Sequence, residues 1–146
     1  MTECRVVRRV SRPIAPVFDL IADIESYPLF MPGWREARTI TRADGQQTVW
    51  QSVSLGGVRV GFVSMAAIER PNRLGIRSDE PPFSAFRLLW ELTEVGASET
   101  VVRAEMAVAF RSRALDQLAA RLMPGVLARS IDAFSRRAAR LPAPQP

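Results

Sequence analysis

The sequence predicts an α+β fold in which a seven-stranded antiparallel sheet curves around a long C-terminal helix. Between Trp34 and Phe110, apolar and polar residues alternate in short runs, as they do in strands with one buried face. Only short turns separate most of these runs, which favours antiparallel neighbours over a parallel sheet. Residues 113–141 then carry apolar side chains at helical spacing, and no other helical stretch is long enough to cover such a sheet.

Three elements are expected ahead of this run. The alternation over Glu3–Val10 predicts the first strand. A helix is expected over Pro13–Ala22, because Pro13 suits a first helical position and the following apolar residues recur at helical spacing. Ser26 is placed to cap a second short helix, which closes at Pro32-Gly33. Two short helices are therefore expected between the first and second strands.

Six further strands are expected in an antiparallel meander. Their predicted ranges are Arg35–Arg42, Thr48–Leu55, Val58–Glu69, Leu74–Ser78, Phe86–Glu94 and Thr100–Phe110. Asp44-Gly45 and Gly56-Gly57 are typical of tight hairpin turns. Alternation is clearest in the last strand, where every second residue from Val102 onward is apolar.

The C-terminal helix carries its apolar side chains on one stripe and most of its arginines on the other. Pro124 lies inside it, and an interior proline costs about 3 kcal/mol. We therefore expect a kink or break near Met123. Residues 142–146 are expected to form a loose tail. Without repeats or a linker, residues 1–146 are expected to form a single domain.

The composition excludes several kinds of chemistry. There is no histidine, no lysine and one cysteine, Cys4. A zinc site of the usual nitrogen and sulfur ligands cannot be assembled, so no metal is expected. Catalytic triads with a histidine base are excluded as well, and so is a catalytic lysine that forms a Schiff base. No catalytic residue is therefore assigned.

The formal net charge is +5, and all the basic residues are arginines spread along the chain. This charge could favour RNA or an anionic membrane surface, but its even spread favours generic surface charge, and we expect no DNA partner. No apolar run approaches the roughly 18–20 residues of a membrane span, and no secretory signal is evident. The expected location is cytoplasmic, with peripheral membrane contact left open.

The inner face of the sheet is expected to be rich in large apolar side chains. The residues placed on it are Trp50, Phe62, Phe86, Trp90, Met106 and Phe110, with the small Ser52, Ala66 and Ala104 beside them. Large rings next to small residues either pack densely or frame a pocket, and the pattern does not decide between these outcomes.

Several motifs resemble the coenzyme-Q-binding, RatA-like branch of the START-like polyketide cyclase/dehydrase superfamily. The most specific is Asp23-Ile24-Glu25-Ser26-Tyr27-Pro28-Leu29-Phe30-Met31-Pro32, which is similar to an Asp-x-Glu-x-Tyr-Pro-x-Phe-x-Pro loop of that family. Weaker matches are Gly61-Phe62, Pro82-Phe83 followed by Trp90, Phe110-Arg111-Ser112, and 133–138 in the last helix. The chain departs from the family at Gly33-Trp34-Arg35-Glu36, where a cysteine is often found.

The resemblance implies a helix-grip (START-like) fold with an apolar tunnel that holds a polyisoprenoid quinone and supports respiration without catalysis. No cofactor is implied beyond such a ubiquinone-like lipid as the bound ligand. The tail is expected against five residues: Phe62, Trp90, Val108, Leu127 and Phe134. The mouth is expected near Phe30, Trp34 and Phe83. Packing in the core is the alternative role for each of them.

Other functions remain open at this stage. Asp23 and Glu25 could form an acid–base pair, although capping or solvation of a loop is favoured. Tyr27 could donate to a ligand carbonyl, although anchoring beside Pro28 is favoured. The resemblance also allows an aromatase or cyclase, which needs polar groups in the pocket, and a ribosome-binding translation inhibitor, whose contact would depend on salt.

Overall fold

Seven antiparallel strands form one curved sheet in residues 1–142, the part of the chain that the computed structural model describes. The elements in chain order are β1 (Thr2–Val10), α1 (Ile14–Ala22), the 3₁₀ helix η1 (Ile24–Leu29), β2 (Trp34–Ala43), β3 (Gln46–Leu55), β4 (Val58–Glu69), β5 (Arg73–Ser78), β6 (Phe83–Glu94), β7 (Thr100–Phe110) and α2 (Arg113–Ala139). The predicted fold class is confirmed. Most of the expected tail, residues 143–146, lies outside the described residues.

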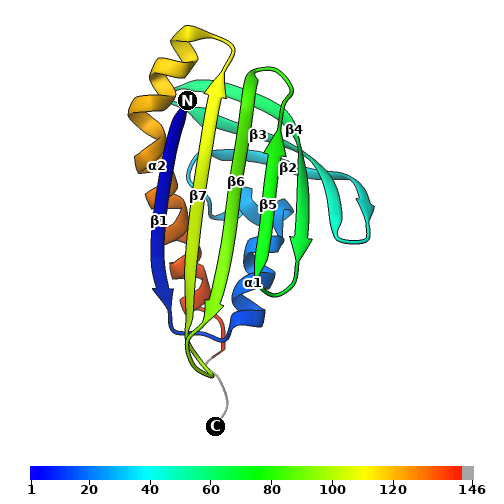
Figure 1. Cartoon of the computed structure of the whole chain (residues 1–146), viewed down its shortest axis with the longest axis vertical. Coiled ribbons are helices and arrows are strands. Elements are labelled where there is room, and N and C mark those ends of the chain that lie inside the picture. Colours follow the sequence, from blue (N-terminus) through cyan, green and yellow to red (C-terminus); the bar gives the residue numbers. More distant parts are fainter. Residues whose placement is uncertain (143–146) are drawn as a thin grey trace.

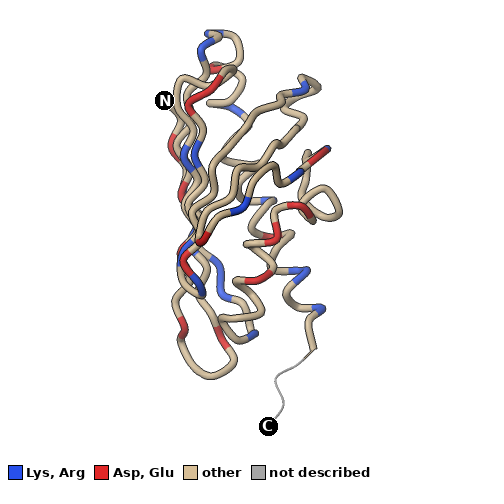
Figure 2. Tube along the Cα trace, turned by 90° about the vertical axis from the view of Figure 1, so that its right-hand side faces the viewer, with Lys and Arg blue, Asp and Glu red and all other residues tan. Residues whose placement is uncertain are grey.

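The strand order is β1-β7-β6-β5-β4-β3-β2, so β2 to β7 form the expected meander. The first strand joins it at the far edge, where Val10 pairs with Thr100 and Thr2 with Val108. Helix α2 packs against β1 and β7 and lies beside them in Figure 1. In Figure 2 the helices lie to one side of the sheet, and arginines are scattered over strands, turns and α2.

Side chains at both ends of α2 stabilise the helix. Ser112 is its N-cap, and the Ser112 Oγ accepts a hydrogen bond of 3.3 Å from the backbone N–H of Leu115. Arg136 and Arg137 lie in the last turn, where positive charge interacts favourably with the helix dipole. Among residues 1–142, no helix is long and apolar enough to cross a membrane.

Of the kink or break expected near Met123, the break is wrong, because the helix continues through Pro124. Its 27 residues span about 40 Å, and apolar side chains on both sides of Pro124 face the sheet. Leu118 and Leu122 are half-buried before the proline, and Leu127 and Ile131 are buried after it. This packing outweighs the local cost of the proline. In Figure 1 the first turns tilt away from the axis of the rest.

Among the boundaries that differ from expectation, the largest differences are at the starts of the short helix and of β6. The short helix begins three residues earlier than expected, and Ser26 lies within it instead of capping it. Asp23 ends α1 and precedes η1 directly, and its carboxylate accepts a hydrogen bond of 2.6 Å from Ser26 Oγ. Strand β6 begins at Phe83, where a register irregularity follows the first pair with β7.

Candidate ligand-binding pocket

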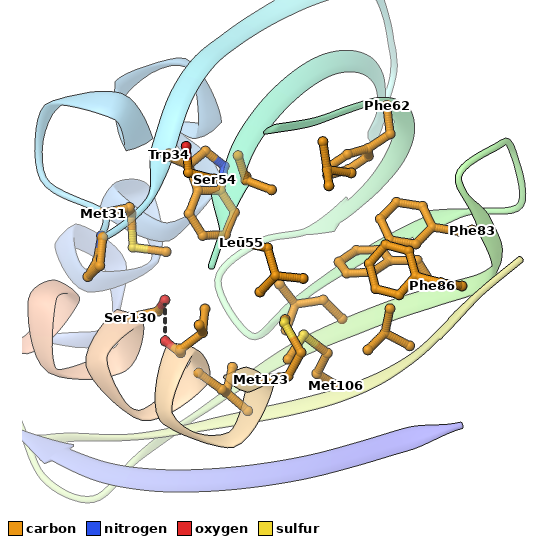
Figure 3. A pocket seen from close by; sticks show the side chains of 18 of the residues that line it. Met31, Trp34, Ser54, Leu55, Phe62, Phe83, Phe86, Met106, Met123 and Ser130 are labelled. Atoms are coloured by element: carbon orange, nitrogen blue, oxygen red, sulfur yellow. Dashed lines mark hydrogen bonds between the residues drawn. The ribbon is translucent and has the colours of Figure 1, made fainter. Parts of the chain in front are cut away.

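A pocket lies between the concave face of the sheet and α2. Its walls come from the segment before β2, from β2, β3, β4, β6 and β7, and from the middle of α2, as Figure 3 shows. The lining residues are Met31, Pro32, Trp34, Val53, Ser54, Leu55, Val60, Phe62, Phe83, Phe86, Leu88, Trp90, Met106, Val108, Phe110, Met123, Val126, Leu127 and Ser130. No ionisable side chain is among these described residues.

One end of the pocket is a cluster of four phenylalanines. The ring of Phe83 lies 4.9 Å from that of Phe62, 5.1 Å from Phe86 and 5.0 Å from Phe110, measured between ring centroids. The Phe83 and Phe110 backbones are paired across β6 and β7, which places both rings on the same face. This phenylalanine cluster forms an apolar wall with no hydrogen-bonding groups.

The opposite end is closed by a second aromatic group that surrounds Tyr27. The Tyr27 ring contacts Phe134 at 5.3 Å and Trp34 at 5.8 Å, and Phe134 contacts Trp90 at 4.9 Å. Phe30 covers Phe134 from outside at 5.1 Å, with the Arg137 guanidinium 4.6 Å from the Phe30 centroid. All the ring pairs are edge-to-face, an arrangement that aromatic quadrupoles favour.

Three of the four polar side chains in the lining already have hydrogen-bond partners. Trp34 Nε1 donates to Gln51 Oε1 at 2.8 Å, and Ser130 Oγ donates to the Val126 carbonyl at 2.7 Å. Ser54 Oγ accepts from Arg35 Nε at 2.9 Å. The exception is Trp90, whose Nε1 is buried without a partner among the described residues. Trp90 is therefore the lining residue that carries an unused donor among the described residues.

The cavity volume is about 60 Å³, which is room for only a few water-sized groups, since one water needs roughly 10–15 Å³. Three of the residues that line it are methionines, namely Met31, Met106 and Met123. Methionine side chains are unbranched and change conformation readily, so they can adapt to occupants of different shape. A ligand longer than this cavity therefore requires these side chains to move.

Nine of the twelve expected ligand-contacting residues line the pocket. They are Trp34, Phe62, Phe83, Phe86, Trp90, Met106, Val108, Phe110 and Leu127. Phe30 and Phe134 belong to the aromatic group behind it. The residues of the expected mouth fall into two aromatic groups, because Phe83 lies in the phenylalanine cluster while Phe30 and Trp34 adjoin Tyr27, and Figure 3 draws Trp34 apart from Phe83.

The expected inward orientation of Trp50 is wrong. In β3 the inner positions belong to Val49 and Gln51, and Trp50 lies on the outer face. There its ring covers Gly61, where an added Cβ would lie 3.2 Å from the indole, and it receives the Arg38 guanidinium at 5.4 Å. Ser52 shares the outer face and accepts a hydrogen bond from Arg59 Nε at 3.1 Å.

Sequence reasoning missed the contribution of α2 on the pocket side. Met123, Val126 and Ser130 line the cavity together with the expected Leu127. Their spacing of three and four residues was visible as a helical stripe, but the expected break at Pro124 obscured its continuity. Met31 was missed because it belongs to an irregular segment without periodicity.

The residues considered for chemistry outside the pocket have structural roles. Glu25 accepts from Arg42 at 2.9 Å and from the backbone N–H of Thr39 at 3.2 Å, which fastens η1 to β2. Tyr27 is 1% exposed and donates its hydroxyl to the Ile21 carbonyl. Burial, and to a smaller extent the Asp23 carboxylate, raises the pKa of Tyr27 above its usual range.

Known proteins similar to this chain include members of a family that is described by lipid transport. A family model described as polyketide cyclase / dehydrase and lipid transport matches residues 10–135. The ribosome association toxin RatA of Escherichia coli is 22% identical over 122 residues, which are 84% of this chain and 77% of that protein.

Two solved structures share the curved sheet and long helix. The Zhui aromatase/cyclase from Streptomyces sp. R1128 superposes with a TM-score of 0.87 at 15% identity, over 94% of this chain and 93% of that one. A START superfamily protein from Mycobacterium smegmatis gives 0.86 at 15% identity, over 97% and 100%. The expected helix-grip (START-like) fold is confirmed.

Proposed function

Because the chain belongs to the polyketide cyclase/dehydrase and lipid transport family, we propose that it binds an apolar small molecule under α2 and carries it without catalysing a reaction. The observation that carries the proposal is the lining itself. Within the described residues, the pocket walls contain no ionisable side chain, whereas acid–base and nucleophilic catalysis need one near the reacting atoms. Apolar walls with few polar groups are typical of a binding site.

A polyisoprenoid quinone such as ubiquinone is the ligand that we propose within this class, which would give the protein a role in respiration. Its tail needs hydrocarbon and aromatic walls, which the phenylalanine cluster and the methionines supply. Its ring needs a few polar groups at one position. Entry of even a short tail requires Met106 and Met123 to move, because the cavity that they line has a volume of only about 60 Å³.

Native mass spectrometry tests this proposal. The protein is purified, incubated with a short-chain ubiquinone and measured under conditions that preserve complexes. We expect a complex of one ligand per chain that Val126→Phe weakens, because a larger side chain at this wall fills the cavity. Trp50→Phe, on the outer face, is the matched control and should bind as the parent does. Only unliganded protein at all quinone concentrations would contradict the carrier function.

A ribosome-binding function is the second candidate, and the similarity to RatA favours it. The arginines on the surface could contact ribosomal RNA through phosphates. We would then expect the protein to sediment with large ribosomal subunits on sucrose gradients at low salt and to dissociate at high salt. If the protein stays at the top of the gradient, apart from the ribosomal subunits, at both salt concentrations, this candidate is rejected and the ligand-binding proposal is unaffected.

A further inference from the structure

Trp90 is the most deeply buried large residue of the pocket, and its indole N–H is unused. The side chain is 0% exposed, and the Nε1 atom has no hydrogen-bond partner in residues 1–142. Most buried polar groups in proteins are hydrogen-bonded, and an unpaired buried donor is costly. An unused donor in the wall of a ligand pocket therefore needs a partner that the chain itself does not supply.

The immediate neighbours of Trp90 cannot supply this partner. In the sheet it pairs with Leu74 on β5 and Ala104 on β7, and both side chains are apolar. The remaining ring contact is Phe134, 4.9 Å away between centroids, which offers at most a weak N–H···π contact. Ser130 Oγ, which also lines the pocket, donates to the Val126 carbonyl and does not accept from the Trp90 N–H. Because no residue in 1–142 accepts from this N–H, a molecule bound in the pocket that Trp90 lines is the candidate acceptor, and it reaches the buried Nε1 when pocket side chains move apart.

We infer that the indole N–H of Trp90 donates a hydrogen bond to an acceptor oxygen of the bound ligand. The inference rests on the proposed function and adds the orientation of the ligand. A carbonyl or ether oxygen lies at the Trp90 end, and the hydrocarbon part extends toward the phenylalanine cluster, which has no hydrogen-bonding groups. The ligand therefore needs an acceptor. This orientation reverses the one that the sequence resemblance implies, in which the tail contacts Trp90.

The arrangement of the three tryptophans makes the inference directly testable. Trp90 lines the pocket with a free N–H, Trp34 lines it with an N–H already bonded to Gln51, and Trp50 lies on the outer face. Each indole gives its own proton–nitrogen signal in NMR of the ¹⁵N-labelled protein. The two other tryptophans are thus internal controls in the same spectrum.

The experiment compares two probes with the same tail, geranyl-1,4-benzoquinone and geranylbenzene, which lacks oxygen. With the quinone, we expect the Trp90 indole proton to move downfield, while the Trp50 signal stays in place and that of Trp34 changes little. With geranylbenzene, the Trp90 proton should show no such downfield shift. Single Trp34→Phe and Trp50→Phe variants assign the signals, so the measurement does not depend on the folding of a Trp90 variant.

Trp90→Phe provides the affinity test, because phenylalanine keeps an aromatic ring and removes the donor. We expect roughly two- to tenfold weaker binding of the quinone relative to geranylbenzene, as one lost hydrogen bond predicts. An unmoved Trp90 signal with quinone bound, or equal effects on both probes, would overturn the inference and leave the apolar-carrier function standing. If neither probe binds, the proposed function itself fails.

Discussion

The indole of Trp34 on β2 and the amide of Gln51 on β3 are joined by a hydrogen bond of 2.8 Å, donated by Trp34 Nε1. Gln51 in turn donates from Nε2 to Ser64 Oγ on β4 at 2.9 Å. Ser64 donates to the backbone carbonyl of Val49 at 3.3 Å. A buried polar chain therefore links three strands beside the pocket, and every member of it has a partner.

Replacing Gln51 by leucine should lower the free energy of unfolding by about 1–3 kcal/mol, because it leaves the Trp34 donor without a partner. Urea denaturation monitored by tryptophan fluorescence measures the change. Gln46→Leu, at an exposed position of the same strand, is the matched control and should change stability by less than about 0.5 kcal/mol. Equal stabilities of the two variants would show that the polar chain contributes nothing.

Tyr27 makes stability depend on pH in the alkaline range. Its pKa is raised in the folded protein by burial and then by Asp23, whereas the unfolded phenol ionises near pH 10. The unfolded state therefore loses its proton first, so the contribution of Tyr27 to stability should be constant below about pH 10 and fall as the pH rises further. Tyr27 is the single tyrosine of the chain, so phenolate absorbance reports this one group.

Tyr27→Phe is the variant that checks this dependence. It should lose about 0.5–1.5 kcal/mol at neutral pH, because the hydrogen bond to the Ile21 carbonyl is removed. Its stability should then decline less above pH 10 than that of the parent, as measured by urea denaturation. Both proteins should carry Cys4→Ser, since burial also raises the pKa of the Cys4 thiol. Parallel pH curves would contradict the assignment.

Trp50→Ala should reduce stability without changing ligand affinity. It uncovers Gly61 and removes the contact with Arg38, a cation–π interaction of about 0.5–1 kcal/mol at an exposed site. Met106→Ala, in the pocket wall, should instead alter the affinity for a short-chain quinone. Isothermal titration calorimetry on both variants tests this. A weakened affinity for Trp50→Ala would argue that the outer-face placement is wrong.

Pro124→Ala should stabilise α2 and slow ligand entry. Alanine restores a backbone N–H and removes a clash one turn back, which is worth up to about 3 kcal/mol. We expect the first turns of α2 to pivot at Pro124 as a ligand enters, away from the Gly56 turn, where Leu122 Cδ1 would lie 2.9 Å from an added Cβ of residue 56. Alanine at position 124 should hinder this movement. Stopped-flow measurement of ligand association checks the second effect. Association rates equal to those of the parent would reject a pivot at Pro124.

The strands could be predicted because each has one buried face and a turn signal at its ends. Val58–Glu69 and Thr100–Phe110 match the structure at both ends. The orientation of Trp50 could not be predicted, since a buried Gln51 is acceptable only with Trp34 and Ser64 as partners, and those come from other strands. The continuity of α2 through Pro124 likewise depends on packing against the sheet.

For the candidate site, the sequence predicted which side chains of a strand lie on the inner face of the sheet, but not how residues of different strands are arranged around the pocket. Phe62, Phe86 and Met106 follow the pleat of their strands, and their positions on the inner face were correct. The separation of Phe83 from Trp34 depends on where β2 and β6 lie within the sheet, which local periodicity does not specify. The unpaired N–H of Trp90 is a property of its three-dimensional neighbours alone.

The pairing of β1 with β7 also has a consequence for biosynthesis. Strand β1 remains without its hydrogen-bonded neighbour until residues 100–110 have been made, and α2, which packs against both strands, follows later still. Contacts between such distant parts of a chain slow folding, because the long intervening loop must close first. The sheet therefore gains its β1 edge only after β7 has been made, and a chain truncated before β7 retains an unpaired β1.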